Sequence, residues 1–314
     1  MSTIDLERIS NKSQIKTLDI LNILEIIKEF SPSISELVKK TNLSHGQIKR
    51  LISSLNPQVV NFSKASQFLI ISKEGEDLLS KQDVDNKQDA NIKELESFIS
   101  YAKGLMPPPK REYDQFYATT ETIVKRVEKF MEQKDLQKRK VAFLGDDDLT
   151  SLAAAFMFSA DEIVVLEIDD NIIAVIEKVA RSYNLRIQCI KWDLKKAVPQ
   201  DLLHKFDTVF TDPPYTEDGF DLFLRRSLEI TKEGGLPAHY ICYGTSSLSR
   251  ERSLKIQQII NSYNLFIREK IHNFNKYIKG AEAVGNASDL YILEKTAKTK
   301  MGKSRAIKKL YTWE

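Results

Sequence analysis

The stretch from Val141 to Ser151 reads Val-Ala-Phe-Leu-Gly-Asp-Asp-Asp-Leu-Thr-Ser. Its first four residues are apolar and typical of a buried β-strand, and a glycine and three carboxylates follow directly. Helical patterns lie on both sides of this run, at about 119–133 and 149–159. The stretch therefore predicts a strand, a loop and a helix, which are the repeating parts of an α/β domain.

The same alternation continues toward the C-terminus. Further apolar runs lie at Ile163–Ile168, Ile187–Lys191, Thr208–Thr211 and His239–Tyr243, and helical patterns lie at about 170–183, 219–231 and 249–263. This order predicts a parallel sheet with helices on both faces. Two later strand candidates, Leu265–Ile271 and Asp289–Glu294, lack a long helix between them, so we expect them to form an antiparallel edge pair. Such a sheet resembles the Rossmann-like fold of class I S-adenosylmethionine-dependent methyltransferases, in which ligands bind at the carboxyl ends of the strands.

The first 81 residues predict a separate small domain. Three short helices and two β-runs, Val59–Phe62 and Phe68–Ile71, follow one another in an order that resembles a winged helix-turn-helix. Ser33 and Glu36 have the spacing of a capping box, and Ser44 can cap the helix that runs to Leu55. This helix could bind DNA, but the module is net neutral, which favours a role in dimerisation or packing.

Two connecting segments complete the predicted domain organisation. Residues 82–111 contain a polar linker, a helix from about Ile92 to Lys103 and the proline run Pro107–Pro109. The α/β domain is expected at 112–294, and a basic tail at 295–314 follows it.

Composition and charge narrow the class of protein. The chain has 314 residues, of which 42% are hydrophobic and 29% charged, and this is ordinary for a globular protein. We find no apolar run of membrane-spanning length and no signal-peptide core at the N-terminus, so we expect a cytoplasmic protein. Cys189 and Cys242 lie in apolar runs and are expected to be reduced, buried thiols.

The basic residues are concentrated at one end of the chain. Residues 1–105 carry 14 basic and 14 acidic side chains, residues 106–294 carry 26 and 29, and residues 295–314 carry 7 and 1. A nucleic-acid-binding protein usually carries its positive charge on the folded surface, so this pattern argues against that class.

The loop after the first strand is the first candidate site. Gly145 is followed by Asp146, Asp147 and Asp148 where a nucleotide-binding fold usually has further glycines. Three carboxylates repel an anionic group and attract ammonium groups. Capping of the next helix would explain one or two of these acids but not all three.

The ends of the next two strands predict contacts with a nucleoside. Glu167, with Ile168 beside it, stands where an acid commonly accepts hydrogen bonds from a ribose diol. Asp193, after Trp192, is placed to accept the amino group of an adenine. Asp169 could cap the helix at 170–183 without any role for Glu167, and Asp193 could cap a short turn instead of binding adenine.

The fourth strand ends in Asp212-Pro-Pro-Tyr-Thr-Glu-Asp218. Pro213 and Pro214 stiffen this turn. A similar tetrapeptide in amino-methyltransferases holds the attacking nitrogen, so we expect Asp212, Pro213 and Tyr215 to bind an amine substrate. We also expect Asp212, together with Gly145, to contact the nucleoside cofactor. Glu217 adds a further acid, so the expected ligand is polycationic.

Three other features outside these strand ends lead to predictions. The segment from Arg111 to Gln115 could fold over the site, which makes Tyr113 a candidate substrate contact. The histidines have no spacing that suggests a metal, so we expect no metal site. The basic tail could close over the cavity, with Trp313 and Glu314 at the substrate, or could bind RNA.

Together these motifs resemble the branched-chain polyamine synthases, the N4-bis(aminopropyl)spermidine synthases of archaea and some thermophilic bacteria. The residues that carry the resemblance are Arg111-Glu-Tyr-Asp-Gln115, Gly145-Asp-Asp-Asp-Leu-Thr-Ser151 and Asp212-Pro-Pro-Tyr-Thr216. The resemblance implies decarboxylated S-adenosylmethionine as the aminopropyl donor, spermidine as the acceptor and methylthioadenosine as a product, without a prosthetic group. The winged-helix module makes a homodimer plausible.

The chemistry of that reaction suits the acidic loop. The attacking amine must lose a proton, and we expect Asp147 to accept it while Asp146 and Asp148 bind ammonium groups. Two other functions stay open: an S-adenosylmethionine-dependent amino-methyltransferase that acts on nucleic acid, and a regulator that senses polyamines without turnover.

Overall fold

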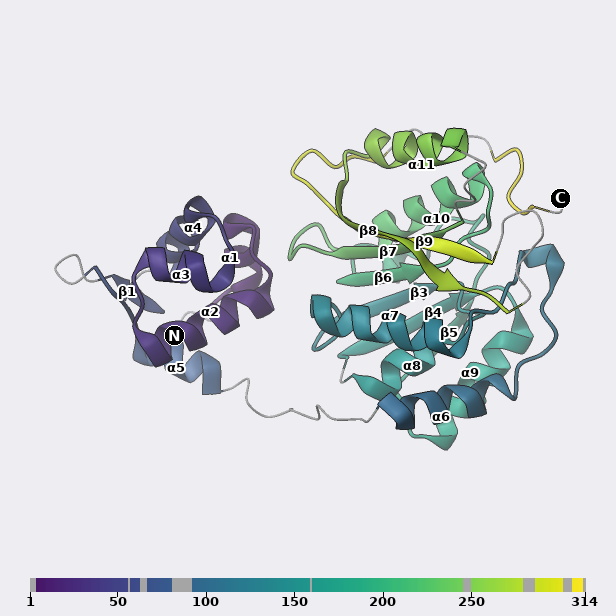
Figure 1. Ribbon diagram of the computed structural model, residues 1–314, viewed down its shortest axis with the longest axis horizontal. Coiled ribbons are helices and arrows are strands. Elements are labelled where there is room, and N and C mark those ends of the chain that lie inside the picture. Colours follow the sequence, from purple (N-terminus) through teal and green to yellow (C-terminus); the bar gives the residue numbers. More distant parts are fainter. Residues whose placement is uncertain are drawn as a thin grey trace. The chain divides into compact units, whose positions relative to one another are not determined.

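A computed structural model describes residues 4–55, 57–62, 67–80, 92–158, 160–244, 250–278, 286–301 and 307–312 (Figure 1). The chain divides into two compact units. The first comprises residues 1–86 with 233–236, and the second comprises residues 87–232 with 237–314. No helix in the described ranges is both long and apolar enough to cross a membrane.

The N-terminal unit contains helices and one small hairpin. Its elements are α1 (Leu6–Ser13), α2 (Thr17–Phe30), α3 (Ile34–Thr41), α4 (His45–Leu55), β1 (Val60–Phe62), β2 (Leu69–Ile71) and α5 (Lys73–Ser80). The capping box at the start of α3 is present, because Ser33 Oγ accepts from the Glu36 N–H and the Glu36 carboxylate accepts from the Ser33 N–H. The predicted helices and hairpin are found, while α1 and α5 are additional. The winged-helix classification stays a prediction, and most of the predicted polar linker lies outside the described residues.

The second unit begins with two helices, α6 (Ile92–Lys103) and α7 (Thr120–Gln133). Strands and helices then alternate: β3 (Lys140–Leu144), α8 (Thr150–Met157), β4 (Glu162–Glu167), α9 (Asp170–Ser182), β5 (Gln188–Lys191), β6 (Thr208–Thr211), α10 (Glu217–Ile230), β7 (Ala238–Tyr243) and α11 (Arg250–Ser262). Two strands end the sheet, β8 (Phe266–Lys276) and β9 (Ala287–Glu294).

In the described part of this unit, seven strands form one sheet in the order β5-β4-β3-β6-β7-β9-β8. Strands β3 to β7 pair in parallel, and β9 is antiparallel to both β7 and β8 (Figure 1). The α/β fold with a parallel sheet and an antiparallel edge pair is therefore confirmed. The chain winds outward from β3 to β5 and then crosses back to β6, so the ends of β3 and β6 flank the point at which ligands bind in such sheets.

The core explains why the sheet is apolar on both faces. Val141 and Phe143 of β3 join a cluster formed with α6 to α9, and Ala142 and Leu144 join a second cluster with Phe206. Both cysteines are free thiols, with Cys242 buried and Cys189 half-buried.

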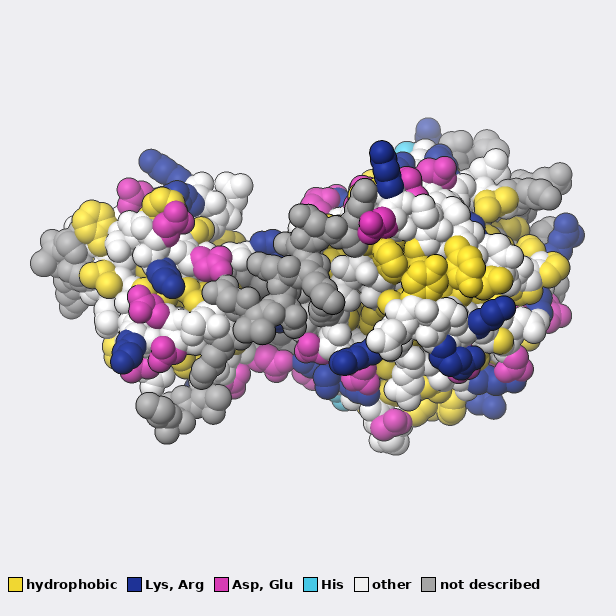
Figure 2. Space-filling view, turned by 90° about the horizontal axis from the view of Figure 1, so that it is seen from below, with side chains coloured by type: hydrophobic (Ala, Val, Ile, Leu, Met, Phe, Trp, Pro, Cys, Tyr) yellow, Lys and Arg dark blue, Asp and Glu magenta, His cyan; other side chains and the backbone are white. Residues whose placement is uncertain are grey.

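Hydrophobic side chains also gather on the face of this unit that α6, α8 and α9 form (Figure 2). The rings of Phe98 and Tyr101 pack against Tyr183, with centroids 4.8 and 5.8 Å away. Tyr101 and Tyr183 remain 45% and 42% exposed, so this face presents aromatic surface to the outside.

Candidate active site

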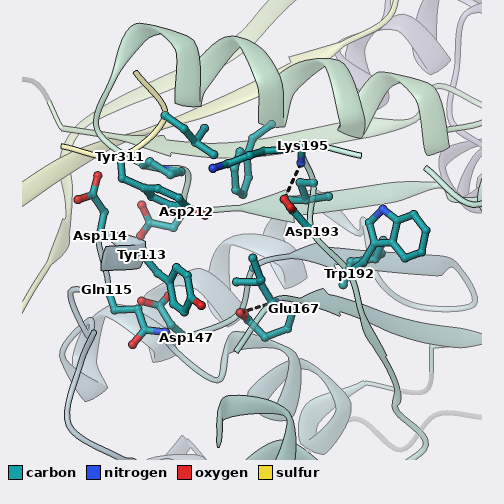
Figure 3. Close-up of a pocket in the computed structure, with 17 residues that line it drawn as sticks. Tyr113, Asp114, Gln115, Asp147, Glu167, Trp192, Asp193, Lys195, Asp212 and Tyr311 are labelled. Atoms are coloured by element: carbon teal, nitrogen blue, oxygen red, sulfur yellow. Dashed lines mark hydrogen bonds between the residues drawn. The ribbon is translucent and has the colours of Figure 1, made fainter. Parts of the chain in front are cut away.

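A cavity opens at the carboxyl ends of β3, β4, β5 and β6 (Figure 3), and the empty space between its walls, open solvent at its mouth included, is about 580 Å³. It is lined by Tyr113, Asp114, Gln115, Gly145, Asp147, Leu166, Glu167, Ile168, Trp192, Asp193, Leu194, Lys195, Asp212, Pro214, Phe223, Leu310 and Tyr311. Five of these side chains are acidic and one is basic. Such a lining favours a cationic ligand.

The acidic loop leaves β3 through Gly145, which has a φ of +68°. A residue with a Cβ rarely adopts this conformation, which explains why this loop keeps a glycine at its first position although it lacks the further glycines of a nucleotide-binding loop. The Asp146 carboxylate turns back and accepts the Ser151 N–H at 3.1 and 3.3 Å, at the start of α8. Of the three aspartates, Asp146 therefore makes the capping contact that the sequence left open as an alternative.

The other two aspartates of the loop have different surroundings. Asp148 is buried, accepts the Ala118 N–H and lies 2.7 Å from Nη1 of Arg126. Asp147 lines the cavity and makes no hydrogen bond with any group in the described part of the chain. Asp147 is therefore the aspartate of the triplet that a ligand in the cavity can reach.

Arg126 of α7 connects the two acidic loops, and sequence reasoning missed it. Its Nη1 donates to Asp148 and its Nη2 donates to Asp212 Oδ2 at 2.8 Å. Arg126 as a whole is 1% exposed, and its guanidinium also donates to Asn275 Oδ1 and Thr150 Oγ1 at 2.8 and 3.0 Å. A single buried cation thus neutralises part of the charge of two carboxylates.

Glu167 ends β4 beside the acidic loop. Its Oε1 accepts the N–H groups of Ile168 and Asp169, and its Oε2 accepts the Asp146 N–H at 2.8 Å. Each carboxylate oxygen has about two acceptor positions, so one remains at Oε2 for a ligand in the cavity. Ile168 and Asp193 also line the cavity, and Asp193 accepts the Lys195 N–H.

The turn after β6 is divided between two hollows. Asp212 lines the main cavity and accepts the Tyr277 hydroxyl at 2.8 Å. Tyr215 and Glu217 line a neighbouring hollow with Lys308 and Lys309 instead.

Pro213 and Glu217 of this turn do not line the main cavity. Pro213 is buried and is not among the lining residues, whereas Pro214 is. Glu217 forms an ion pair with Lys255 at 2.6 Å, and both side chains face solvent.

Two segments far apart in the sequence close one side of the cavity. Tyr113, Asp114 and Gln115 come from the segment before α7, and Leu310 and Tyr311 come from the C-terminal segment (Figure 3). The Asp114 carboxylate accepts both the N–H and the hydroxyl of Thr312, at 2.7 and 2.8 Å. The tail residues from Leu310 to Thr312 therefore lie at the cavity. The predicted contacts of Trp313 and Glu314 fall outside the described residues.

Burial changes the acidity of this cluster. It raises the pKa of Asp147 well above the usual range, and the charges of Asp148 and Asp212 raise it further. Burial also raises the pKa of Asp212 to about 6, although the Arg126 charge opposes this shift. Asp212, with a pKa of about 6, can therefore exchange a proton near neutral pH.

The structure brings together most of the residues that the sequence indicated. Seven of the predicted residues line the cavity: Tyr113, Gly145, Asp147, Glu167, Ile168, Asp193 and Asp212. Five others lie behind or beside it: Asp146, Asp148, Pro213, Tyr215 and Glu217. The individual roles of these residues stay predictions.

Comparison with known proteins identifies similar sequences. The family described as "Branched-chain polyamine synthase A C-terminal domain" matches residues 93–310. An N(4)-bis(aminopropyl)spermidine synthase of Thermococcus kodakarensis is 36% identical over 192 residues, which cover 60% of this chain and 54% of that protein. An uncharacterized protein of Methanocaldococcus jannaschii is 38% identical over 200 residues, covering 63% of this chain and 49% of that protein. The chain thus spans about half the length of the curated relatives it matches.

Solved structures share the fold. The branched-chain polyamine synthase of Thermus thermophilus, crystallised with N4-aminopropylspermidine and 5′-methylthioadenosine, aligns with a TM-score of 0.63 at 21% identity. The alignment covers 98% of this chain and 96% of that one. A putative RNA methyltransferase of Pyrococcus horikoshii aligns with a TM-score of 0.53 at 17% identity over 65% of this chain and 98% of that one.

Proposed function

Because this chain belongs to the branched-chain polyamine synthase A family, we propose that it transfers aminopropyl groups from decarboxylated S-adenosylmethionine to the secondary amine of spermidine. The observation that carries the proposal is the cavity lining of five acidic side chains and one basic side chain. A donor that has lost its carboxylate and an acceptor with several ammonium groups are both cations, and such a lining attracts both. The names of the related synthases support the same reaction.

The donor is assigned to the β4 and β5 side of the cavity. The remaining acceptor position of Glu167 Oε2 is available for a ribose hydroxyl, and Asp193 is available for the amino group of the adenine. Gly145 and Ile168 give the nucleoside close approach to the backbone. This placement leaves the sulfonium facing the acidic loop after β3 and Asp212.

The acceptor is assigned to the side of the cavity near Asp147 and Asp212. The amine nitrogen of spermidine attacks the carbon next to the sulfonium, a C–N bond forms and the C–S bond breaks. The electron pair of the broken bond stays on sulfur, and methylthioadenosine leaves as a neutral thioether. The proton of the attacking amine goes to Asp147, which has no partner of its own in the described structure.

A second transfer has a different proton requirement. The first transfer makes a tertiary amine, and the second makes a quaternary ammonium without loss of a proton during attack. Loss of the base should therefore slow the first transfer more than the second.

A product assay by mass spectrometry tests the proposal. The purified full chain is incubated with spermidine and decarboxylated S-adenosylmethionine, and with intact S-adenosylmethionine in parallel. Methylthioadenosine and a branched polyamine from the decarboxylated donor alone are the expected products. Methyl transfer to nucleic acid from the intact donor, with no branched polyamine, would instead support the amino-methyltransferase.

We extend the proposal to a cytoplasmic homodimer. The free thiols of Cys189 and Cys242 fit a reducing compartment, and the exposed rings of Tyr101 and Tyr183 offer an apolar contact surface. Light scattering should give about twice the chain mass of 36.0 kDa. A mass of one chain at micromolar concentration would contradict the dimer.

A further inference from the structure

We propose that Arg126 is a positioning residue for the polyamine, because it holds Asp148 and Asp212 as oriented anions and leaves Asp147 unpaired. The inference deepens the proposed function and rests on it. It concerns a residue of α7 that does not line the cavity and acts through two residues of other loops.

The geometry of the guanidinium supports this role. Nη1 reaches Asp148 Oδ2 at 2.7 Å and Nη2 reaches Asp212 Oδ2 at 2.8 Å, so one planar group joins the loops after β3 and β6. Nε donates to Asn275 Oδ1 at 2.8 Å, and the group lies 4.9 Å from the centre of the Phe210 ring. These contacts leave the guanidinium no alternative orientation. A lysine at this position would offer one point charge and could not reproduce the fork.

Burial makes the pairing necessary. The side chain of Asp148 is 3% exposed and that of Asp212 is 11% exposed, while the guanidinium has no exposed surface. A buried carboxylate that has no cation beside it takes up a proton instead of remaining charged. Without Arg126, Asp212 would become a neutral acid and would lose its attraction for ammonium groups.

Asp212 combines this pairing with access to the cavity. Arg126 and the Tyr277 hydroxyl both bind Oδ2, and Tyr277 is itself fixed by Ser288 Oγ at 2.7 Å. Asp212 still lines the cavity. Arg126 and Tyr277 therefore fix the Asp212 carboxylate in place, and the carboxylate remains accessible to a ligand in the cavity.

The acidity of Asp212 follows from the same contacts. Burial raises its pKa to about 6, Arg126 lowers it, Asp148 raises it, and the Tyr277 hydroxyl lowers it. Other titratable groups face this cluster from every element packed against it: Lys103 of α6, Asp146 and Asp147 of the acidic loop, Glu167 of β4, Tyr117 before α7, Tyr215 after β6, Cys242 of β7 and Tyr277 after β8. Among these influences, Arg126 is the strongest that keeps Asp212 ionised.

The test is the pH dependence of spermidine binding to the full chain, measured by calorimetry with methylthioadenosine present. In the wild type, affinity should fall as the pH drops through about 6, where Asp212 becomes neutral. Arg126→Gln should move this fall upward by about one to three pH units. Asp148→Asn removes a charge that raises the pKa of Asp212, so it should move the fall downward. The double variant should return toward the wild-type profile.

A matched control separates positioning from simple loss of a buried arginine. Arg225 of α10 is 8% exposed and pairs with Asp221 at 3.0 Å, and it does not line the cavity. Arg225→Gln should lower the melting temperature and leave the pH profile in place. An Arg126→Gln profile that differs from wild type only by a constant factor would overturn the inference.

Two further outcomes are decisive. If Arg126→Gln does not fold, Asp148→Asn must still shift the profile downward, and an unchanged profile overturns the inference. Turnover in the product assay is measured separately. Wild-type turnover with unshifted profiles refutes the role of Arg126 alone, whereas spermidine binding without turnover refutes the proposed function alone.

Discussion

Two acidic segments of this chain have similar composition, but their carboxylates have different surroundings in the structure. The loop after β3 contains Asp147, which lines the cavity and has a pKa raised by burial. The segment after β6 contains Glu217 and Asp218, which face a different hollow. Glu217 pairs with Lys255 at 2.6 Å, and Asp218 accepts the backbone N–H groups of Lys308 and Lys309. Placement in the cavity raises the pKa of Asp147 and of Asp212, and the number of acids in a segment does not predict this placement.

The positions of the two segments in the fold explain the difference. The first loop leaves the central strand β3, so its residues enter the crevice at the carboxyl ends of the sheet. Glu217 and Asp218 instead occupy the first turn of α10, after the N-cap Thr216. Acids in a first turn interact favourably with the helix dipole at the surface and need no ligand.

The largest expected effect is the loss of the proton acceptor. Asp147→Asn should lower kcat for the first aminopropyl transfer by about 10²- to 10⁴-fold, because the amide cannot accept the amine proton. Transfer to a purified mono-branched polyamine should fall less. Single-turnover assays with each acceptor measure the two rates. Equal losses for both acceptors would mean that Asp147 acts by charge or position and is not the base.

The next effect concerns the binding of the acceptor. Asp212→Asn removes one anion of the cavity and one partner of Arg126, so the KM for spermidine should rise by about 10- to 100-fold. The KM for the donor should change little. Asp193→Asn is the matched control on the donor side and should show the opposite pattern. If both variants change the same KM, the division of the cavity into two sides is wrong.

A smaller effect is expected on stability. Because burial raises the pKa of Asp147 in the folded state, its protonation favours folding. This contribution is fully present below the unfolded pKa of about 4 and is lost as the pH rises through the folded pKa. This contribution therefore declines above about pH 4, and Asp147→Asn should melt a few degrees higher than wild type at pH 7. The difference should shrink toward pH 4, and scanning calorimetry across this range would detect a result of the opposite sign.

These contrasts also show what sequence reasoning can reach in this chain. Strand ends in a parallel sheet share one edge, so Gly145, Glu167 and Asp212 could be assigned to one site from the alternation of strands and helices. The number of acids after β6 was a weaker guide, because it did not distinguish Asp212 from Glu217.

Contacts between residues that are far apart in the sequence were not predicted from it. Arg126 is separated by 22 residues from Asp148 and by 86 from Asp212, and Asp114 is separated by 198 from Thr312. No local pattern predicts such pairs, since an arginine at the apolar face of an amphipathic helix has no signature of its own. The alternation of helices and strands predicts a helix at about 119–133, but it does not predict the buried cation on it.

The smallest effect is expected for the exposed ion pair of Glu217 and Lys255, which belongs to the second of the two acidic segments. Lys255 and Glu217 keep 55% and 42% of their side-chain surface exposed, so solvent and salt screen their attraction. Glu217→Gln should therefore change the KM for spermidine by less than about threefold and leave the melting temperature near that of the wild type. Steady-state kinetics at low and at physiological salt measure this. A tenfold rise in KM that persists at high salt would mean that the polyamine extends into the hollow beside Tyr215, and that acids outside the cavity also select the substrate.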